Sequence, residues 1–306
     1  MDAMADLTLV ASIARCGSLT ATAQEQGVTT PAISRRLAAL EQRLGVALFA
    51  RTTRTLLLTP EGERYLQAAR RILDDIGELE RSLRGSHAEP QGLLRVNATF
   101  GFGRRHIAPA IALFAARHPQ LSVQLSLTER MPAPGEGSFD VSIRFGPPPD
   151  ARLCAQRIVH NRRILCAAPA YLQQAAPIRQ PQDLSRHQCL FVRENDAVYG
   201  QWQLQCDGQQ QRVRVSGRLS ANDGESVVGW GLAGHGVMLR SEWDVGAALG
   251  DGRLQRVLPQ WQGTPADIYA LYPPALTLSA RVRLFVDFLC QHFAEAATGA
   301  VTRDSK

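Results

Sequence analysis

The first sixty residues alternate stretches of helical hydrophobic spacing with small polar or glycine breaks. A first amphipathic helix is predicted by apolar residues at positions i, i+3, i+4 and i+7, namely Leu7, Val10, Ala11 and Ala14. Gly17 is suited to end this helix, and Ser18 to cap a second one over residues 19–26. Gly27 then falls where a helix-turn-helix needs a turn of about three or four residues.

Thr30 and Pro31 predict the start of a third helix, because threonine is a good cap and proline at the first helical position loses no hydrogen bond. The residues expected in its buried stripe are Ile33, Leu37, Leu40 and Leu44. Its exposed N-terminal end carries Pro31 together with small polar residues and arginines, which are Thr29, Thr30, Ser34, Arg35 and Arg36. Helix-turn-helix proteins insert such an end into the major groove of DNA.

The alternative for this third helix is an ordinary charged face in solvent. We favour DNA binding because the turn, the helix start and the polar cluster coincide. Arg35 and Arg36 lie about 100° apart around a helix. We therefore expect Arg35 near a phosphate and Arg36 near a base or the flanking backbone.

An arginine-rich turn follows, with Arg51 and Arg54 at its ends, and a short apolar strand is predicted over residues 55–59. A strand behind such a turn is typical of a wing. A wing lets arginines reach the sugar-phosphate backbone or the minor groove beside the recognition helix. Both arginines therefore join the predicted DNA-binding set.

A long helix is predicted from Pro60 onward, with Thr59 as its cap and Glu61 in its first turn. Its apolar residues follow an alternating spacing of four and three, and they are Tyr65, Ala69, Ile72, Ile76, Leu79 and Leu83. The alternative is a surface helix packed on its own domain. We favour a helix pair that makes a dimer, because linking two DNA-binding modules raises the effective concentration of the second.

From residue 93 onward, strand patterns alternate with helix patterns. Strands are predicted over 93–98, 121–127, 139–145, 162–168, 211–218, 236–239 and 268–271. Helices are predicted over 107–118, 225–232 and 279–296. This alternation predicts open, mostly parallel sheets, which bind small molecules beyond the carboxyl ends of their strands.

Two loops of this second part fit a ligand cleft, because each precedes a predicted helix whose N–H groups favour anions. The residues expected to bind the effector are Thr99, Phe100, Gly101, Asn222 and Asp223, with Arg144 at a strand end adding positive charge. The alternative for each loop is a capped turn without a ligand.

Several kinds of chemistry are not expected. Gly101 and Gly103 do not complete a dinucleotide-binding glycine motif, because its third glycine is replaced by His106. Arg104 and Arg105 are instead expected as surface charge at a lobe or subunit contact. Histidine spacing for a metal and a serine nucleophile elbow are both missing, so we expect no catalytic residue, no metal and no cofactor.

Composition adds modest constraints. A chain of 306 residues with net charge +6 predicts roughly two domains and favours a polyanionic partner. None of the six cysteines forms a C-x-x-C pair, so we expect buried thiols in a reducing cytosol, with a redox switch between Cys154 and Cys166 as the alternative. With neither a signal peptide nor a long apolar run, the protein is expected to be cytoplasmic and not membrane-bound.

The chain resembles the LysR-type transcriptional regulators over nearly its whole length. The resemblance rests on the ordered residues of 23–54 and 58–62, with further agreement at 103–109, 140–144 and 168–172. It implies an α+β multidomain protein with a winged helix-turn-helix, a linker helix and a two-lobed α/β effector domain like that of periplasmic binding proteins. The expected domains are 1–59, 60–88 and 91–300, with lobe I at about 91–160 and 266–297 and lobe II at about 161–265.

The resemblance also assigns residues and partners. Thr29, Thr30, Pro31, Ser34 and Arg35 match the DNA-reading positions, Arg51 and Arg54 the wing, and Thr99, Phe100 and the Asn222–Asp223 loop the effector cleft. Residues 131–135 depart from the family pattern and contain two prolines, which forbid helix there. The implied partners are promoter or operator DNA, a small-molecule effector and a second copy, as a homodimer or homotetramer, with RNA polymerase as a further candidate.

Our hypothesis from the sequence is a sequence-specific DNA-binding regulator, not an enzyme, controlled by a small anionic effector between two lobes. One rival is a redox sensor of the same architecture. The other is a small-molecule binding protein or enzyme with a helical N-terminus. That rival predicts a catalytic group, which the sequence does not contain in any recognised motif, and activity that survives deletion of residues 1–88.

Overall fold

The structure is a computed structural model that describes residues 2–51, 56–83, 90–131, 139–146, 152–193, 200–277 and 279–301. The chain forms two compact units, residues 1–88 and 89–306. We call them the N-terminal unit and the regulatory unit.

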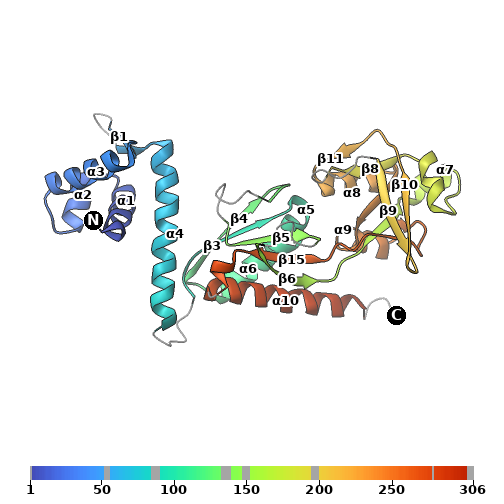
Figure 1. Cartoon of the computed structure of the whole chain (residues 1–306). Helices are drawn as coiled ribbons and strands as arrows, with labels where there is room; N and C mark the ends of the chain where they lie inside the picture. Colours follow the sequence, from blue (N-terminus) through green and yellow to red (C-terminus); the bar gives the residue numbers. More distant parts are fainter. Residues whose placement is uncertain are drawn as a thin grey trace. The chain divides into compact units, whose positions relative to one another are not determined.

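The N-terminal unit consists of helices and one small hairpin (Figure 1). Its elements are α1 (Ala3–Cys16), α2 (Leu19–Glu25), α3 (Thr30–Leu44), β1 (Phe49–Arg51), β2 (Leu56–Leu58) and α4 (Pro60–Leu83). Gly17 ends α1 in the left-handed conformation, with φ of 65°, and Ser18 caps α2 through its side chain. Both predicted roles are confirmed, and α2 ends one residue before the predicted boundary.

The core of this unit brings the apolar stripes of its helices together with residues of the hairpin. The buried members are Leu9, Val10, Ile13, Ala23, Ile33, Leu37, Leu40, Leu48, Phe49 and Leu66. Two details of the prediction for α3 are wrong. Leu44 is 36% exposed because it lies in the last turn, beyond the packed stripe. Thr29, not Thr30, occupies the N-cap position, and its side chain makes no capping bond.

The hairpin is joined tightly to the helices on either side of it. Glu41 of α3 accepts the backbone N–H groups of Leu48 and Phe49, at 2.7 and 3.1 Å. Thr59 caps α4 by accepting the N–H of Gly62 at 2.9 Å, as the sequence predicts. A Cβ on Gly62 would lie 1.9 Å from the carbonyl oxygen of Leu48, so this position admits only glycine.

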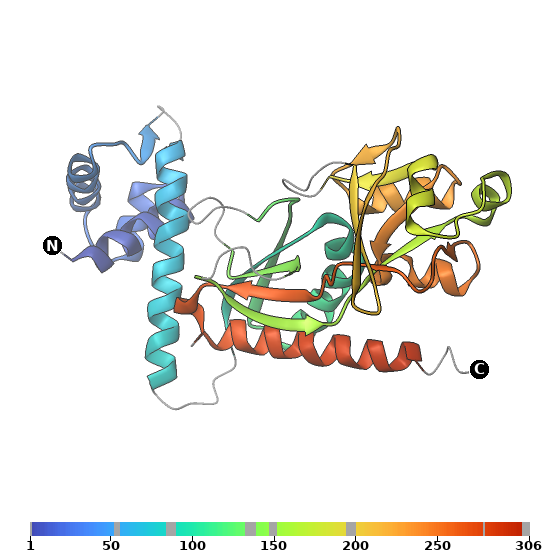
Figure 2. The same cartoon turned by 45° about the vertical axis from the view of Figure 1, so that its right-hand side comes forward.

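Lobe I of the regulatory unit is built on a sheet with strand order β4-β3-β5-β15-β6 in the described part of the chain. Its strands are β3 (Gly92–Ala98), β4 (Leu121–Leu127), β5 (Val141–Phe145), β6 (Cys154–Val159) and β15 (Ile268–Tyr272). Its helical segments are α5 (Phe100–Phe102), η1 (Gly103–Ile107), α6 (Ala108–Arg117), η3 (Pro274–Leu276) and α10 (Ala280–Val301). In Figure 2, α10 runs along this sheet. The phenylalanines of α10 pack with Phe114 of α6 in the core.

Lobe II is built on a second sheet, whose described strand order is β10-β9-β14-β7-β12-β8-β11, with β13 also paired to β7. Its strands are β7 (Arg163–Ala167), β8 (Cys189–Val192), β9 (Gln201–Cys206), β10 (Gln209–Arg214), β11 (Ser220–Ala221), β12 (Val237–Ser241), β13 (Gln255–Arg256) and β14 (Gln262–Gly263). Its helices are α7 (Pro169–Gln174), η2 (Pro181–Arg186), α8 (Gly224–Leu232) and α9 (Glu242–Gly250).

The chain crosses between the lobes twice, after β6 and before β15. The two crossings are hydrogen-bonded to each other through Asn161. Its side-chain amide donates to the carbonyl of Ala266 at 2.8 Å, and its backbone N–H donates to the carboxylate of Asp267 at 3.0 Å. Ser241 of lobe II donates to Asn161 at 2.8 Å. The crossings therefore form one bonded joint between the lobes.

The expectation of mostly parallel sheets is wrong. In lobe I, β3 is parallel to β4 and β5, but β15 runs antiparallel to β5 and β6. In lobe II, the pairs of β12 with β8 and of β11 with β8 are parallel, and the pairs of β7, β9, β10, β13 and β14 are antiparallel. The chain leaves lobe I after β6 and returns to it before β15. The returning strand β15 therefore runs beside β5 and β6 in the opposite direction.

Candidate functional site

The N-terminal end of α3 is an open polar surface. Thr29 and Pro31 are exposed there, Thr30 and Ser34 are partly exposed, and the helix lacks a side-chain cap. The unfilled N–H groups of a helix start carry positive potential, which favours a phosphate. The predicted DNA-binding residues of α3 therefore lie together where an anion is favoured.

Arg35 and Arg36 of α3 differ in their surroundings. Arg35 is exposed, and the described residues provide it with no ion pair. Arg36 is also exposed but donates to the carbonyl of Ala5 in α1, at 3.2 Å. Glu41, the one acidic residue of α3, is held against the start of β1 and does not offset Arg35. Arg35 is therefore the arginine of α3 most available to DNA.

The wing prediction is described in part. β1 and β2 pair antiparallel, with Arg51 opposite Leu56. Arg54 lies outside the described residues, and only the backbone of Arg51 is described. The contribution of both arginines to DNA binding remains a prediction.

The predicted dimerisation residues divide along α4. Ala69 is fully buried and Tyr65 packs against the core of the N-terminal unit, so these two are not on a free face. Ile72 is 43% exposed, and Ile76 is partly exposed. The side chains of Leu79 and Leu83 lie outside the described residues. A free apolar face among the described residues therefore begins at Ile72.

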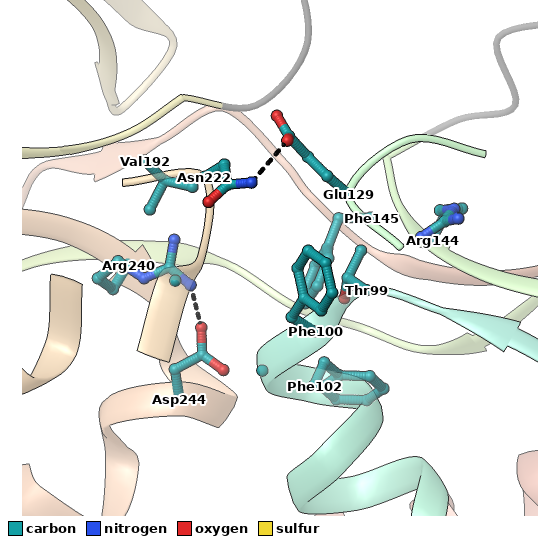
Figure 3. Close-up of a pocket in the computed structure, with 12 residues that line it drawn as sticks. Thr99, Phe100, Phe102, Glu129, Arg144, Phe145, Val192, Asn222, Arg240 and Asp244 are labelled. Atoms are coloured by element: carbon teal, nitrogen blue, oxygen red, sulfur yellow. Dashed lines mark hydrogen bonds and ion pairs between the residues drawn. The ribbon is translucent and has the colours of Figure 1, made fainter. Parts of the chain in front are cut away.

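A cavity of about 90 Å³ lies between the two lobes of the regulatory unit (Figure 3). Lobe I contributes residues of α5, the end of β5 and the segment after β4, and lobe II contributes the ends of β8 and β12 and the starts of α8 and α9. The lining residues are Thr99, Phe100, Gly101, Phe102, Glu129, Arg144, Phe145, Val192, Asn222, Gly224, Arg240 and Asp244.

Arg144 is buried in a cage of neutral acceptors. It is 8% exposed, and its Nη atoms donate to the side chains of Asn97 and Thr128 and to the carbonyls of Thr128 and Arg130. Its Nε is buried without a partner. No carboxylate in the described part of the chain pairs with it, and burial lowers its pKa to about 10.

Arg240 faces the cavity from lobe II and is also 8% exposed. It pairs with Asp244, four residues later at the start of α9. A Cβ on Gly224 would lie 2.1 Å from Nη2 of Arg240, so glycine at the start of α8 leaves room for the guanidinium. Arg240 is therefore charge-compensated within the protein, whereas no described carboxylate compensates Arg144.

The predicted effector residues are largely brought together. Thr99, Phe100, Gly101, Arg144 and Asn222 all line the cavity (Figure 3). Asn222 also donates to Glu129 of lobe I at 3.1 Å.

Asp223 does not line the cavity. Its carboxylate accepts the N–H groups of Glu225 and Ser226 at the start of α8, at 3.3 and 3.1 Å, and so acts as a helix cap. The positive end of α8 is thereby already occupied.

Sequence reasoning missed three polar lining residues, Glu129, Arg240 and Asp244. A signal for Arg240 exists, because Val237–Ser241 repeats the pattern of Val141–Phe145, with arginine fourth in each strand. Each lobe thus ends one buried strand with an arginine at the cavity. Glu129 follows β4, and Asp244 follows β12 at the start of α9. The sequence does not reveal which strands β4 and β12 pair with, so it does not place these two side chains at the cavity.

The cysteines do not favour the redox alternative. All six are free; Cys154 lies in the lobe I sheet, and Cys166 lies buried in the lobe II sheet. Burial raises the pKa of Cys166, and likewise of Cys189, to about 12, so thiolate is scarce at neutral pH. Among the described residues, no cluster of three or more His, Cys, Asp or Glu side chains is arranged to hold a metal ion.

None of the described helices is both long and apolar enough to cross a bilayer.

Two family descriptions match the chain. Residues 4–63 match the bacterial regulatory helix-turn-helix protein, lysR family, and residues 87–294 match the LysR substrate binding domain. The chain is 40% identical over 290 residues to the HTH-type transcriptional regulator DmlR of Escherichia coli (strain K12), covering 95% of this chain and 94% of that protein. It is 38% identical over 284 residues to the HTH-type transcriptional activator TtdR of the same strain, covering 93% and 91%.

Solved structures agree with these matches. CrgA, a LysR-type transcriptional regulator from Neisseria meningitidis, aligns with a TM-score of 0.59 at 29% identity, covering 94% of this chain and 98% of that one. The full-length structure of the Vibrio cholerae virulence activator AphB aligns with a TM-score of 0.57 at 29% identity, with the same coverage.

Proposed function

The chain belongs to the LysR family of DNA-binding transcriptional regulators, and from this premise we propose that a small anionic effector, bound between its two lobes, controls its binding to specific DNA sites. The effector shifts the lobes, and the oligomer passes that shift to its DNA-binding modules. As a regulator of DNA, it would act in the cytoplasm.

One observation supports the charge of the effector most strongly. Arg144 is buried at the cavity, and no carboxylate of the described residues pairs with it. A buried charge is stable when it is paired, and the described part of its own lobe offers Arg144 only neutral acceptors. An anion in the cavity supplies the missing charge, and Nε of Arg144 is the donor still unused.

The cavity limits the size of the effector. At roughly 10–15 Å³ per water-sized group, a volume of about 90 Å³ holds a ligand of fewer than about ten non-hydrogen atoms. Its walls combine Phe100, Phe145 and Val192 with the polar atoms of Thr99 and Asn222. A compact carboxylate with a short carbon chain fits this mixture.

For the DNA site, we propose that the start of α3 enters the major groove, with Thr29, Thr30, Pro31, Ser34 and Arg35 at base edges and phosphates. Arg36 holds α3 against α1 through its hydrogen bond to Ala5. From there it reaches the sugar-phosphate backbone that flanks the groove. The wing, with Arg51 and Arg54, adds backbone contacts. Two modules joined through α4 from Ile72 onward read two half-sites as a dimer, or as a tetramer of two dimers.

The effector proposal is tested by ligand-induced stabilisation. Purified full-length protein is melted with a panel of mono-, di- and tricarboxylates, against neutral analogues of the same carbon skeletons. We expect at least one small carboxylate to raise the Tm in a dose-dependent way, because a ligand that binds only the folded state stabilises it. If only the neutral analogues raise the Tm, and no carboxylate does, the proposal of an anionic effector is refuted.

Two variants locate the site. Arg144→Met removes the cation, and Thr99→Val alters the cavity wall without changing its volume much. Both variants should lose the rise in Tm that the carboxylate causes. The control is Arg117→Met, which replaces an exposed arginine outside the cavity and should keep that rise. If Arg144→Met does not fold, Thr99→Val still decides the matter. Equal responses in wild type and Thr99→Val would place the carboxylate elsewhere.

The DNA proposal has its own test, independent of any effector. Full-length protein is mixed with sheared genomic DNA and with random duplex of the same length at fixed salt, because affinity depends steeply on salt. We expect retained genomic fragments to share a site with two half-sites. Equal retention of genomic and random DNA would exclude sequence-specific binding.

A further inference from the structure

Two of the contacts between the lobes have opposite character. Beside the joint of the crossings, Trp243 of lobe II packs edge-on against His106 and Phe293 of lobe I, with ring centroids 5.4 Å apart in both pairs. It also lies edge-on to Phe102, at 6.4 Å. Its Nε1 donates to the carbonyl of His160 at 3.4 Å. This aromatic contact is apolar and packed with the core.

The second contact is polar and lies at the rim of the cavity. Arg104 of lobe I donates to Glu225 of lobe II through Nε at 2.9 Å and Nη2 at 2.6 Å. Nη2 also lies 3.3 Å from Asp223. Arg105 adds a hydrogen bond from Nη1 to the carbonyl of Asp244, at 3.0 Å. One turn of lobe I thus supplies cations to the starts of two lobe II helices.

Local structure explains why this turn reaches lobe II. Residues Gly103–Ile107 form a π-helical turn between α5 and α6, a rare conformation that often marks a functional site. A Cβ on Gly103 would lie 2.4 Å from Cδ2 of Leu127, so glycine lets the turn lie close to β4. A Cβ on Gly101 would lie 3.6 Å from the backbone nitrogen of Glu225, an ordinary van der Waals distance. The arginines therefore start from a backbone held close to both lobes.

Asp223 links this contact to the interior of lobe II. Burial disfavours its ionised form, but hydrogen bonds from Ser226 and from the N–H groups of α8, with the charge of Arg104, outweigh burial and lower its pKa. The same carboxylate thus caps α8 and pairs with Arg104. Asn222, the residue before Asp223, also bonds across the lobes, to Glu129 (Figure 3).

We propose that Arg104, Asp223 and Glu225, together with the Asn222–Glu129 bond, form a latch that holds the lobes together when no effector is bound. The aromatic contact of Trp243 is the fixed side, about which the latched side opens. The latch is made of partly exposed charges, with Arg104 at 45% and Glu225 at 38% side-chain exposure. Each pair is therefore weak and screened by salt, which suits a contact that must open.

The latch does not depend on the identity of the effector or on DNA binding, so its test can fail while the proposed function stands. The readout is hydrogen exchange of the full-length protein, followed in peptides that cover 99–103 in lobe I and 224–232 in lobe II. For Arg104→Ala we expect exchange about three- to fivefold faster in both peptides, in line with a small network of exposed ion pairs. The matched control is Arg253→Ala, whose arginine is 59% exposed and pairs with Asp251 inside lobe II.

Coupling separates a latch from a local helix cap. Glu225→Gln should resemble Arg104→Ala, and the double variant should be little faster than either single one. Arg104→Glu should open the lobes further, and adding Glu225→Arg should slow exchange again. In wild type, raising salt from about 0.05 to 0.5 M should bring exchange to the level of Arg104→Ala, because screening weakens exposed pairs.

Two outcomes would overturn the latch. The first is faster exchange confined to 224–232, which would make Arg104 only a support for α8. The second is additive effects in the double variant with no rescue by the reversed pair. If Arg104→Ala proves unstable, Glu129→Gln offers a separate test, since it removes the charge at the Asn222 bond and should speed exchange in the same two peptides.

Discussion

Arg35 of the N-terminal unit and Arg144 of the regulatory unit carry the same side chain into opposite surroundings. Arg35 stands exposed at the open end of a helix, whereas Arg144 is 8% exposed among neutral acceptors. Arg36 and Arg240 repeat the contrast, since one is exposed on α3 and the other is buried against Asp244. The arginines proposed to face DNA and those that line the cavity thus differ in hydration before any partner binds.

This difference indicates how each partner is recognised. An exposed arginine keeps its water and exchanges it for one of many phosphates, so its contribution is modest and depends on salt. A buried arginine has already lost its water, so a single anion in the right place gains a strong interaction. The first surface suits a long polyanion and the second a small ligand. The following predictions test that contrast, beginning with the largest expected effect.

Stability should separate the two arginines most clearly. Arg144→Met removes one hydrogen-bond donor from the buried acceptors of Asn97 and Thr128, and we expect it to lower the free energy of unfolding by about 2–4 kcal/mol. Arg35→Met should change it by less than about 0.5 kcal/mol. Urea unfolding followed by circular dichroism measures both. Arg253→Met is the control for an exposed arginine of the regulatory unit, and equal losses in all three variants would remove the contrast.

DNA affinity should show the reverse order. Arg35→Ala should weaken specific binding by about 1–3 kcal/mol, or weaken binding to all sequences and lower the salt slope by about one if it contacts only phosphate. Arg36→Ala should have a smaller effect, because Arg36 is engaged with Ala5. Fluorescence anisotropy at several salt concentrations distinguishes these results. Arg64→Ala, an exposed arginine on α4, is the control, and a loss equal to that of Arg35→Ala would shift the DNA surface away from α3.

Mild acid should weaken one unit and spare the other. Burial lowers the pKa of His106 and of His187, both in the regulatory unit, whereas the described residues of the N-terminal unit contain no histidine. The unfolded chain takes up these protons near pH 6.5 and the folded unit takes them up only at lower pH, so stability is full above about pH 6.5 and falls below it. Hydrogen exchange between pH 7.5 and 5.5, corrected for intrinsic rates, checks this.

The pH prediction has a specific control. His106→Gln removes one of the two groups and should reduce the pH dependence of the regulatory unit while leaving that of the N-terminal unit unchanged. A loss of protection that is equal in the two units between these pH values would contradict the assignment to histidine.

The smallest effect is expected for an exposed ion pair inside the N-terminal unit. Arg43 pairs with Asp6 at 2.8 Å and is 41% exposed, so Arg43→Ala should lower stability by no more than about 1 kcal/mol. The measured loss should shrink further at high salt. A loss as large as that of Arg144→Met would show that exposure does not decide the contribution of an arginine in this protein.

The sequence predicts most of the N-terminal unit because its signals are local. Gly17, Ser18 and Thr59 act on the helices beside them, and the structure bears out all three roles. The cavity residues that were predicted also have local signals, such as the helix start after Thr99. The polar start of α3 was visible for the same reason, because cap, proline and arginines are neighbours in the chain.

What the sequence did not predict depends on contacts between distant residues. The antiparallel pairing of β15 with β5 joins positions more than a hundred residues apart, so no window of sequence contains it. The opposition of Arg104 and Glu225 across the lobes has the same origin. The role of Asp223 as a helix cap is local, and the side-chain rule for caps would have assigned it.

The close approach of Gly62 to Leu48 has a mechanical consequence. No side chain separates α4 from the hairpin at Gly62. Thr59 bonds to the carbonyl of Ala47, and Glu41 bonds to the N–H of Leu48, so α4 and the hairpin are packed rigidly together here. A rotation at the far end of α4 would therefore be passed to the hairpin and to α3, the helix proposed to read DNA, with little loss. Any larger residue at position 62 would separate α4 from the hairpin and weaken this mechanical link, without changing any residue proposed to contact DNA.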